Sequence, residues 1–289
     1  MVVQPECYAC LLHMAELTVD LASLDPEKRA RAGEMARALI HREFRPGAVP
    51  ACIANQVHRA IREQTGNADP FSSRKQAETA YLSFIYPRIA PAYQENLDSL
   101  LRLAVAGNAI DYFRNEEEVS REILTPVAWS HNDLEPFRRR LEGSGGTLLY
   151  LADNAGEQFF DLPLVLHLRS LGWRTLFVVK GGPVQNDLTR DDLYASGLGE
   201  ALEPLADTGA RTVGLVLAET SASFQKIYAA AGLILAKGMG HFETLSHFPD
   251  PRVFFLLQAK CPPVAQALGV PHRGFVLRQA ASAASDRQK

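Results

Sequence analysis

The sequence has few cysteines, no strong excess of either charge and no long apolar run, and each shortage excludes a class of protein. Four cysteines among 289 residues are too few for a disulfide-stabilised scaffold. Lys and Arg number 30 against 33 Asp and Glu, so no basic excess suggests a nucleic acid partner. No run approaches the roughly 18 apolar residues that a transmembrane helix needs, so we expect no membrane partner.

The N-terminal segment also lacks the features of a secretory signal peptide. Glu6, His13 and Glu16 interrupt its apolar residues, and no basic start precedes them. Together with the few cysteines, this predicts a reducing, cytoplasmic location. The remaining composition, 47% hydrophobic and 22% charged, is typical of a soluble globular enzyme.

The two halves of the chain differ in their hydrophobic periodicity. From Cys7 to about Leu141 the apolar residues recur at helical spacing. After the glycine-rich segment 143–146, short β-type runs alternate with amphipathic stretches, which predicts a parallel sheet with helices on both faces. We therefore predict an α/β protein in which an all-helical domain, 1–143, precedes a Rossmann-like, mostly parallel sheet domain, 144–289. The expected strands are 147–153, 174–181, 211–218, 231–238 and 252–259.

Polar side chains follow several of these expected strands. In an open α/β sheet, ligands bind beyond the carboxyl ends of the strands. Asp153 ends the first expected strand and Asn154 follows it, and Asp187 lies shortly after the second. Their oxygens suit an octahedral divalent cation such as Mg²⁺ or Mn²⁺, with water or substrate oxygens completing the shell. Lysines end three of the expected strands, at Lys180, Lys237 and Lys260.

The same edge of the sheet has features of a phosphate site. Gly156 would let the backbone approach a ligand, and a helix beginning near Glu157 would direct N–H groups, including that of Ala155, toward it. Lys237 supplies a positive charge that suits phosphate. An Asp at such a junction is often only a helix N-cap, so the hypothesis depends on the convergence of separate loops.

Several segments in order resemble those of a known family. The segments 151–161 (LADNAGEQFFD), 179–192 (VKGGPVQNDLTRDD) and 234–245 (ILAKGMGHFETL) are similar to the family catalogued as domain of unknown function 89. That family is described as metal-dependent damage-control phosphatases, including the acidic-residue methyltransferase-like proteins. The resemblance covers nearly the whole chain, and its stand-alone prokaryotic branch is also suggested by Cys7-x-x-Cys10, 65–75, 104–113 and 256–265.

This resemblance implies a helical domain packed on a Rossmann-like domain, with a divalent metal (Mn, Mg, Co or Ni) between them. It implies the three oxygen ligands named above, a phosphate-side lysine at Lys237, and a polar pair of the helical domain at Asn108 and Asp111. One segment departs from the family pattern KGQGNFE, because Met239 and His241 replace its Gln and Asn. This departure is expected to affect substrate specificity more than metal binding. Substrates in the family range over sugar phosphates and phosphopantetheine derivatives.

The resulting hypothesis is a metal-dependent phosphomonoester hydrolase that acts on a small phosphorylated metabolite. The expected catalytic residues are Asp153, Lys237 and Glu157, with water preferred to Asp153 as nucleophile and Glu157 orienting that water or only favouring the helix dipole. The alternative is a non-catalytic regulator that binds a metal and a phosphate ligand. A methyltransferase is disfavoured, because no glycine-rich loop follows the first strand. The expected substrate contacts are Asn108, Asp111, Ala155, Gly156, Gly238 and His241.

Cys7-x-x-Cys10, with His13 nearby, has two interpretations. It could be a second metal site, but zinc sites take four ligands and the sequence has no second CxxC pair. On a helix, Cys7 and Cys10 would share one face, as ordinary buried cysteines can. We favour packing.

Overall fold

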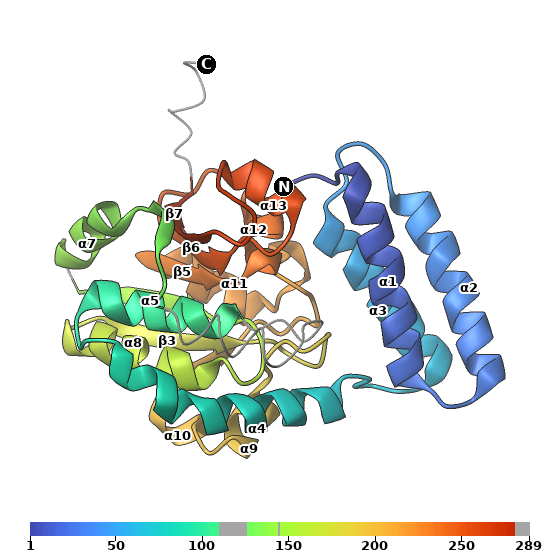
Figure 1. Ribbon diagram of the computed structural model, residues 1–289, viewed down its shortest axis with the longest axis horizontal. Helices are drawn as coiled ribbons and strands as arrows, with labels where there is room; N and C mark the ends of the chain where they lie inside the picture. Colours follow the sequence, from blue (N-terminus) through green and yellow to red (C-terminus); the bar gives the residue numbers. More distant parts are fainter. Residues whose placement is uncertain (110–125, 144, 281–289) are drawn as a thin grey trace.

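The computed structural model describes residues 1–109, 126–143 and 145–280 and has a seven-stranded sheet at its centre (Figure 1). The strand order is β1-β7-β6-β5-β2-β3-β4, and every neighbouring pair is parallel except β6 and β7. This confirms the predicted α/β class with a mostly parallel sheet. The strands are β1 (Trp129–Asn132), β2 (Thr147–Leu151), β3 (Arg174–Val179), β4 (Leu205–Asp207), β5 (Leu233–Lys237), β6 (Val253–Gln258) and β7 (Phe275–Gln279).

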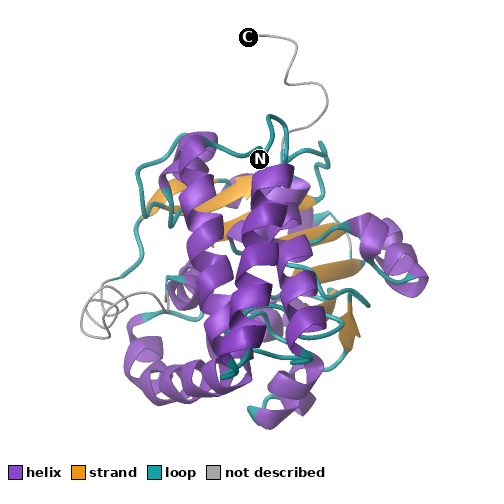
Figure 2. Cartoon of the chain, turned by 90° about the vertical axis from the view of Figure 1, so that its right-hand side faces the viewer, coloured by secondary structure: helices purple, strands orange, loops and turns teal. Residues whose placement is uncertain are grey.

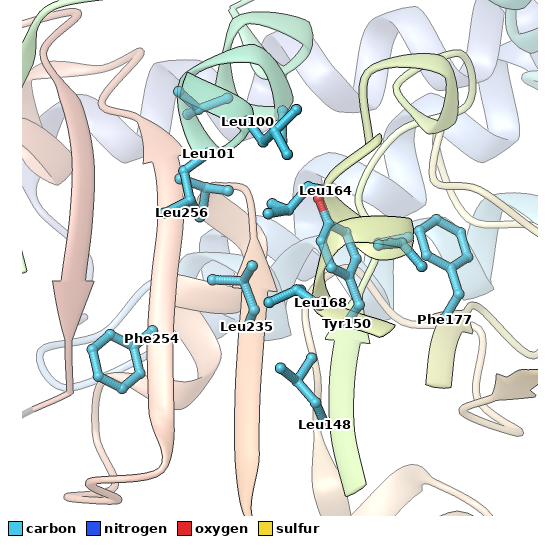
Figure 3. Packing of buried hydrophobic residues seen from close by; sticks show 14 of the residues in the cluster. Leu100, Leu101, Leu148, Tyr150, Leu164, Leu168, Phe177, Leu235, Phe254 and Leu256 are labelled. Atoms are coloured by element: carbon cyan, nitrogen blue, oxygen red, sulfur yellow. The ribbon is translucent and has the colours of Figure 1, made fainter. Parts of the chain in front are cut away.

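The central strands are buried on both faces, as parallel strands usually are. Every residue of β5 and β6 is buried, including Lys237 at the end of β5. On one face, Tyr150 stacks on Phe177 and packs with leucines of the covering helices (Figure 3). The other face has its own apolar cluster. Because helices cover both faces of the sheet, these strands are continuous apolar runs and do not alternate between apolar and polar residues.

The covering helices belong to two layers. One layer, of which Figure 3 shows residues of α5 and α8, consists of α5 (Leu97–Asn108), α7 (Leu134–Glu142), α8 (Gln158–Ser170), α9 (Arg190–Ala195) and α10 (Gly199–Leu202). The opposite layer consists of α11 (Ala222–Ala230), α12 (Met239–Leu245) and α13 (Pro262–Leu268). The chain also has two short 3₁₀ helices, η1 (Ala90–Ala92) and η2 (Leu217–Glu219).

Three N-terminal helices form a bundle beside the sheet (Figures 1 and 2). They are α1 (Pro5–Ala22), α2 (Pro26–Glu43) and α3 (Pro50–Thr65). Each begins with a proline, whose fixed φ suits the first helical turn and whose missing N–H is not needed there. A fourth helix, α4 (Ser72–Ile89), leaves the bundle and packs against α8. Among the described residues, no helix combines the length and apolarity needed to cross a membrane.

Two parts of the predicted organisation are wrong. Residues 1–143 are not all helical, because β1 lies in this segment and pairs with β7. Its alternating half-exposed pattern contains no apolar run that would signal a strand. The expected strand 211–218 is a loop followed by η2, and β4 lies before it. Asn55 of α3 binds the backbone N–H and C=O of Val213, so a side chain takes the hydrogen bonds that a sheet would have used.

Candidate active site

A cavity of about 500 Å³ lies where the carboxyl ends of β2, β3, β5 and β6 meet the helical bundle. Helices α1, α3 and α4 form one side of it, and the loops after the four strands form the other. This is the position that the strand-end rule predicts for a ligand. The polar and charged residues of its lining include Arg74, Glu78, Asp153, Asn154, Gln185, Asn186, Asp187, Glu243 and Lys260.

The structure brings the three predicted metal ligands together. Asn154 and Asp187 form an isolated antiparallel β-bridge, which joins the loop after β2 to the loop after β3. The backbone N–H of Leu188 also donates to the carbonyl of Asp153 at 2.8 Å. Two loops more than thirty residues apart are thereby held side by side at the cavity wall. This arrangement fits the expectation that Asp153, Asn154 and Asp187 share one ligand.

Asp153 is surrounded by amide donors and by other carboxylates. Its Oδ2 accepts from Asn108 Nδ2 at 2.8 Å and from Asn154 Nδ2 at 3.0 Å. Burial, together with the negative charges of Glu157 and Asp187, raises the pKa of Asp153 to about 8. The ionised side chain therefore lies in a region where added positive charge would stabilise it.

Asn108 supports this group of side chains. Its amide nitrogen also donates to Glu157 Oε1 at 3.0 Å, and its oxygen accepts from the backbone N–H of Gln258. The end of α5 is thereby tied to both β6 and the Asp153 loop. Asp111, the other member of the predicted polar pair, lies outside the described residues.

Lys237 lies beneath the cavity in a buried ion-pair cluster. Its Nζ is 2.6 Å from Glu157 Oε2 and 2.5 Å from Asp161 Oδ1, and the side chain is fully buried. Burial opposes the charge, but Asp161 and Glu157 outweigh it and hold the pKa of Lys237 above its ordinary value. The sequence suggested a lysine directed at phosphate, whereas the structure directs it at Glu157, which in turn accepts from Asn154.

The N–H groups predicted to face a phosphate are used within the protein. Ala155 N–H donates to the carbonyl of Asn186 at 2.9 Å, and Gly156 N–H donates to Gln158 Oε1 at 2.6 Å. The prediction that these two groups bind phosphate is therefore wrong, because loop pairing and the first turn of α8 satisfy them. Gly156 has a φ of +97°, and a Cβ there would lie 2.6 Å from the Leu82 side chain of α4. The absence of a Cβ at Gly156 therefore makes room for α4 and not for a ligand.

His241 is buried behind the cavity wall. Its Nδ1–H donates to the carbonyl of Lys237 at 2.6 Å, so Nε2 is left to accept from Lys180 Nζ at 3.3 Å. Burial and the charge of Lys180 lower the pKa of His241, which keeps it neutral. Lys180 also donates to the carbonyl of Gly214 and lies 3.2 Å from Asp187 Oδ2. The sequence hypothesis of substrate contact by His241 is thus replaced by a link through Lys180 to Asp187.

Gly238 is required by the position of the Asp153 carboxylate. It has a φ of +83°, and a Cβ at this position would lie 2.0 Å from Asp153 Oδ2. We expect Gly238→Ala to displace that carboxylate and to abolish the phosphatase activity that the sequence resemblance implies, measured as phosphate release. Gly66→Ala is the matched control, because Gly66 has a φ of +75° with no atom near its Cβ position. It should lose about 1–2 kcal/mol of stability through backbone strain but keep its activity. Full activity of Gly238→Ala would contradict this assignment.

Two cavity residues that we did not assign from the sequence carry charge at the site. Glu78 of α4 accepts from Asn186 Nδ2 at 3.0 Å, and burial raises the pKa of Glu78 to about 7. Lys260, two residues after β6, lines the cavity, and its charge lowers the pKa of both Asp153 and Glu157. Its position after a strand was a usable signal for Lys260. No strand-end signal exists for Glu78, because it lies on a helix.

The two cysteines of the Cys7-x-x-Cys10 motif differ in their exposure. Cys7 is buried and Cys10 is exposed on α1, and both line the cavity together with His13. Within the described part of the chain, no three His, Cys, Asp or Glu side chains are grouped closely enough to hold a metal ion. The predicted metal site instead combines two carboxylates with an amide.

The family described as the damage-control phosphatase ARMT1-like domain matches residues 3–275 of the chain. The chain belongs to this family. Damage-control phosphatase PH1575 of Pyrococcus horikoshii is 34% identical over 284 residues, which cover 96% of this chain and 97% of that protein. A damage-control phosphatase of Archaeoglobus fulgidus is 28% identical over 93% of this chain and 96% of its own length.

The fold of this family member is also known from a solved relative. The crystal structure of a DUF89 family protein from Pyrococcus horikoshii superimposes with a TM-score of 0.86 at 32% sequence identity. The match covers 97% of this chain and 99% of that chain. The family resemblance of the sequence is therefore confirmed over both the bundle and the sheet.

Proposed function

We propose that the protein hydrolyses a small phosphorylated metabolite, a phosphomonoester, with a divalent cation held by Asp153, Asn154 and Asp187. The observation that carries this proposal is the meeting of these three side chains at a cavity that Lys260 also lines. Hard carboxylate and amide oxygens are the donors that Mg²⁺ and Mn²⁺ prefer. The names of the two phosphatase relatives agree with this reaction.

The charges around Asp153 support a cation at this place. Two further buried carboxylates, Glu157 and Asp187, raise the pKa of Asp153 more than Lys260 and Lys180 lower it, so a bound cation would stabilise its ionised form. Gly238 keeps the space beside Asp153 free of a Cβ atom. When bound, the cation would supply Lewis-acid polarisation of a phosphoryl oxygen.

Residues of the chain would supply charge neutralisation, a proton and the positioning of the metal ligands. The Lys260 ammonium would neutralise charge on the phosphoryl oxygens, because it lines the cavity close enough to affect Asp153. The Glu78 carboxyl, with a pKa of about 7, would hold a proton at the cavity wall and give it to the leaving oxygen. Asn108 and Lys180 are positioning residues, since they hold Asp153 and Asp187 respectively.

Asp153→Asn tests the proposal. The substitution keeps the shape of the side chain but removes one metal-binding charge. We expect phosphate release from p-nitrophenyl phosphate and from sugar phosphates, assayed with Mg²⁺, Mn²⁺, Co²⁺ or Ni²⁺, to fall by at least about 10²-fold, because such a metal contributes several kcal/mol. The free energy of unfolding without metal should stay unchanged or rise, since repulsion by Glu157 and Asp187 is relieved.

Asp207→Asn is the matched control for this experiment. Asp207 ends β4 at the same edge of the sheet, but its side chain is 42% exposed and lies outside the cavity lining. It should retain wild-type activity and metal content. Unchanged metal content in Asp153→Asn would overturn the ligand assignment. If the wild-type protein binds metal but releases no phosphate from any ester, the regulator hypothesis replaces the phosphatase.

A further inference from the structure

The cavity is much larger than a phosphoryl group and a cation require. Its volume of about 500 Å³ is equivalent to roughly seventeen water molecules at about 30 Å³ each. Most of the space therefore belongs to the organic part of a ligand. The volume falls within the usual range for small-molecule sites, about 300–1,000 Å³.

Much of the cavity wall away from the metal-binding loops is apolar. We call this wall the apolar sector, and it combines side chains of the bundle with side chains of the sheet domain. Most charged residues of the lining gather around the loops after β2, β3 and β6 and on α4, whereas Glu6 and His13 of α1 and Glu243 of α12 lie next to the sector. The apolar sector consists of Leu11, Met14, Leu17, Pro50, Ala51, Ala54, Phe71, Val213, Met239 and Pro262.

Hydrogen bonds between the bundle and the sheet domain fix the position of this sector. Asn55 of α3 binds the backbone of Val213 at both N–H and C=O, with distances of 2.7 and 3.3 Å. The backbone N–H of Ala51, in the first turn of α3, donates to Glu243 Oε2 of α12 at 2.9 Å. These bonds join the two sides of the cavity close to its apolar lining. The sector is thus a built wall of the site rather than a surface that the bundle happens to expose.

We propose that the apolar sector selects phosphomonoesters with an extended, largely apolar organic group over compact, fully hydroxylated sugar phosphates. This inference rests on the proposed phosphatase function. A hydroxylated sugar would lose hydrogen bonds to water against Leu11, Met14 and Phe71 without gaining replacements. An alkyl or aryl group would instead remove apolar surface from water on both sides.

A series of n-alkyl phosphates from methyl to hexyl tests this proposal on the wild-type protein. Each added methylene should raise kcat/KM by about 3–4-fold until the sector is filled, the ratio that corresponds to about 0.8 kcal/mol per buried CH₂. The gain should come mainly through KM, because the chain contacts the wall in both ground and transition states. Glucose 6-phosphate should be a poorer substrate than hexyl phosphate.

Met14→Gln combined with Met239→Gln makes the sector polar with little change of volume. The ratio of kcat/KM for hexyl over methyl phosphate should fall at least fivefold in this variant. Met35→Gln is the matched control, because Met35 is a half-buried methionine of α2 outside the cavity lining, and the ratio should not change. Hydrolysis with a flat or falling dependence on chain length would overturn this inference alone. Failure to hydrolyse any ester would overturn the proposed function and the inference with it.

Discussion

Replacing Lys237 by methionine should destabilise the protein by about 3–5 kcal/mol or prevent its folding, because breaking a buried ion pair leaves an uncompensated buried charge. Lys237 Nζ is the cation between Glu157 and Asp161, both of which are buried. Methionine fills most of the volume but leaves these two carboxylates without their partner. Urea denaturation of the purified metal-free variant would measure the loss.

A second variant distinguishes a role of Lys237 in the buried ion pair from a role at the phosphate. Adding Asp161→Asn to Lys237→Met should recover part of the stability, because one unpaired carboxylate becomes neutral. Lys226→Met, at an exposed position of α11, should change stability by less than about 0.5 kcal/mol. A Lys237→Met protein as stable as wild type but without activity would show that Lys237 acts at the phosphate, as the sequence first suggested.

Lys260→Met should reduce kcat/KM by about 10²–10³-fold, the range for loss of one transition-state donor, while leaving stability nearly unchanged. Lys260 lines the cavity, and its charge acts on Asp153 and Glu157. Steady-state phosphate release with a divalent metal would give the rate, and metal titration would show whether cation affinity is retained.

Two further variants sharpen this test. Lys260→Arg keeps the positive charge and should recover part of the lost activity. Lys226→Met removes the same charge from the surface and should match wild type. If Lys260→Met turns over normally, the phosphate-facing cation is another residue of the lining, and Arg74 of α4 is the next to test.

Strand-to-helix alternation was enough to predict the parallel sheet, and with it the edge at which Asp153, Asn154 and Asp187 meet. The reason is geometric: parallel strands with right-handed crossovers bring all their carboxyl ends to one edge, whatever the side chains are. Hydrophobic periodicity also located four of the five expected strands. It failed for 211–218, where Asn55 of α3 binds the backbone of Val213. That contact spans 158 residues and leaves no local pattern.

By itself, the sequence determined the α/β class, the helical segment before the sheet, and which oxygen donors lie at the strand ends, because periodicity and chain order encode these locally. Only the tertiary structure decided what each charged group faces. Lys237 ends β5 and Lys260 lies two residues after β6, yet Glu157 and Asp161 pair with Lys237 while Lys260 lines the cavity. Burial and long-range pairing determine that difference, and neither is visible in local spacing.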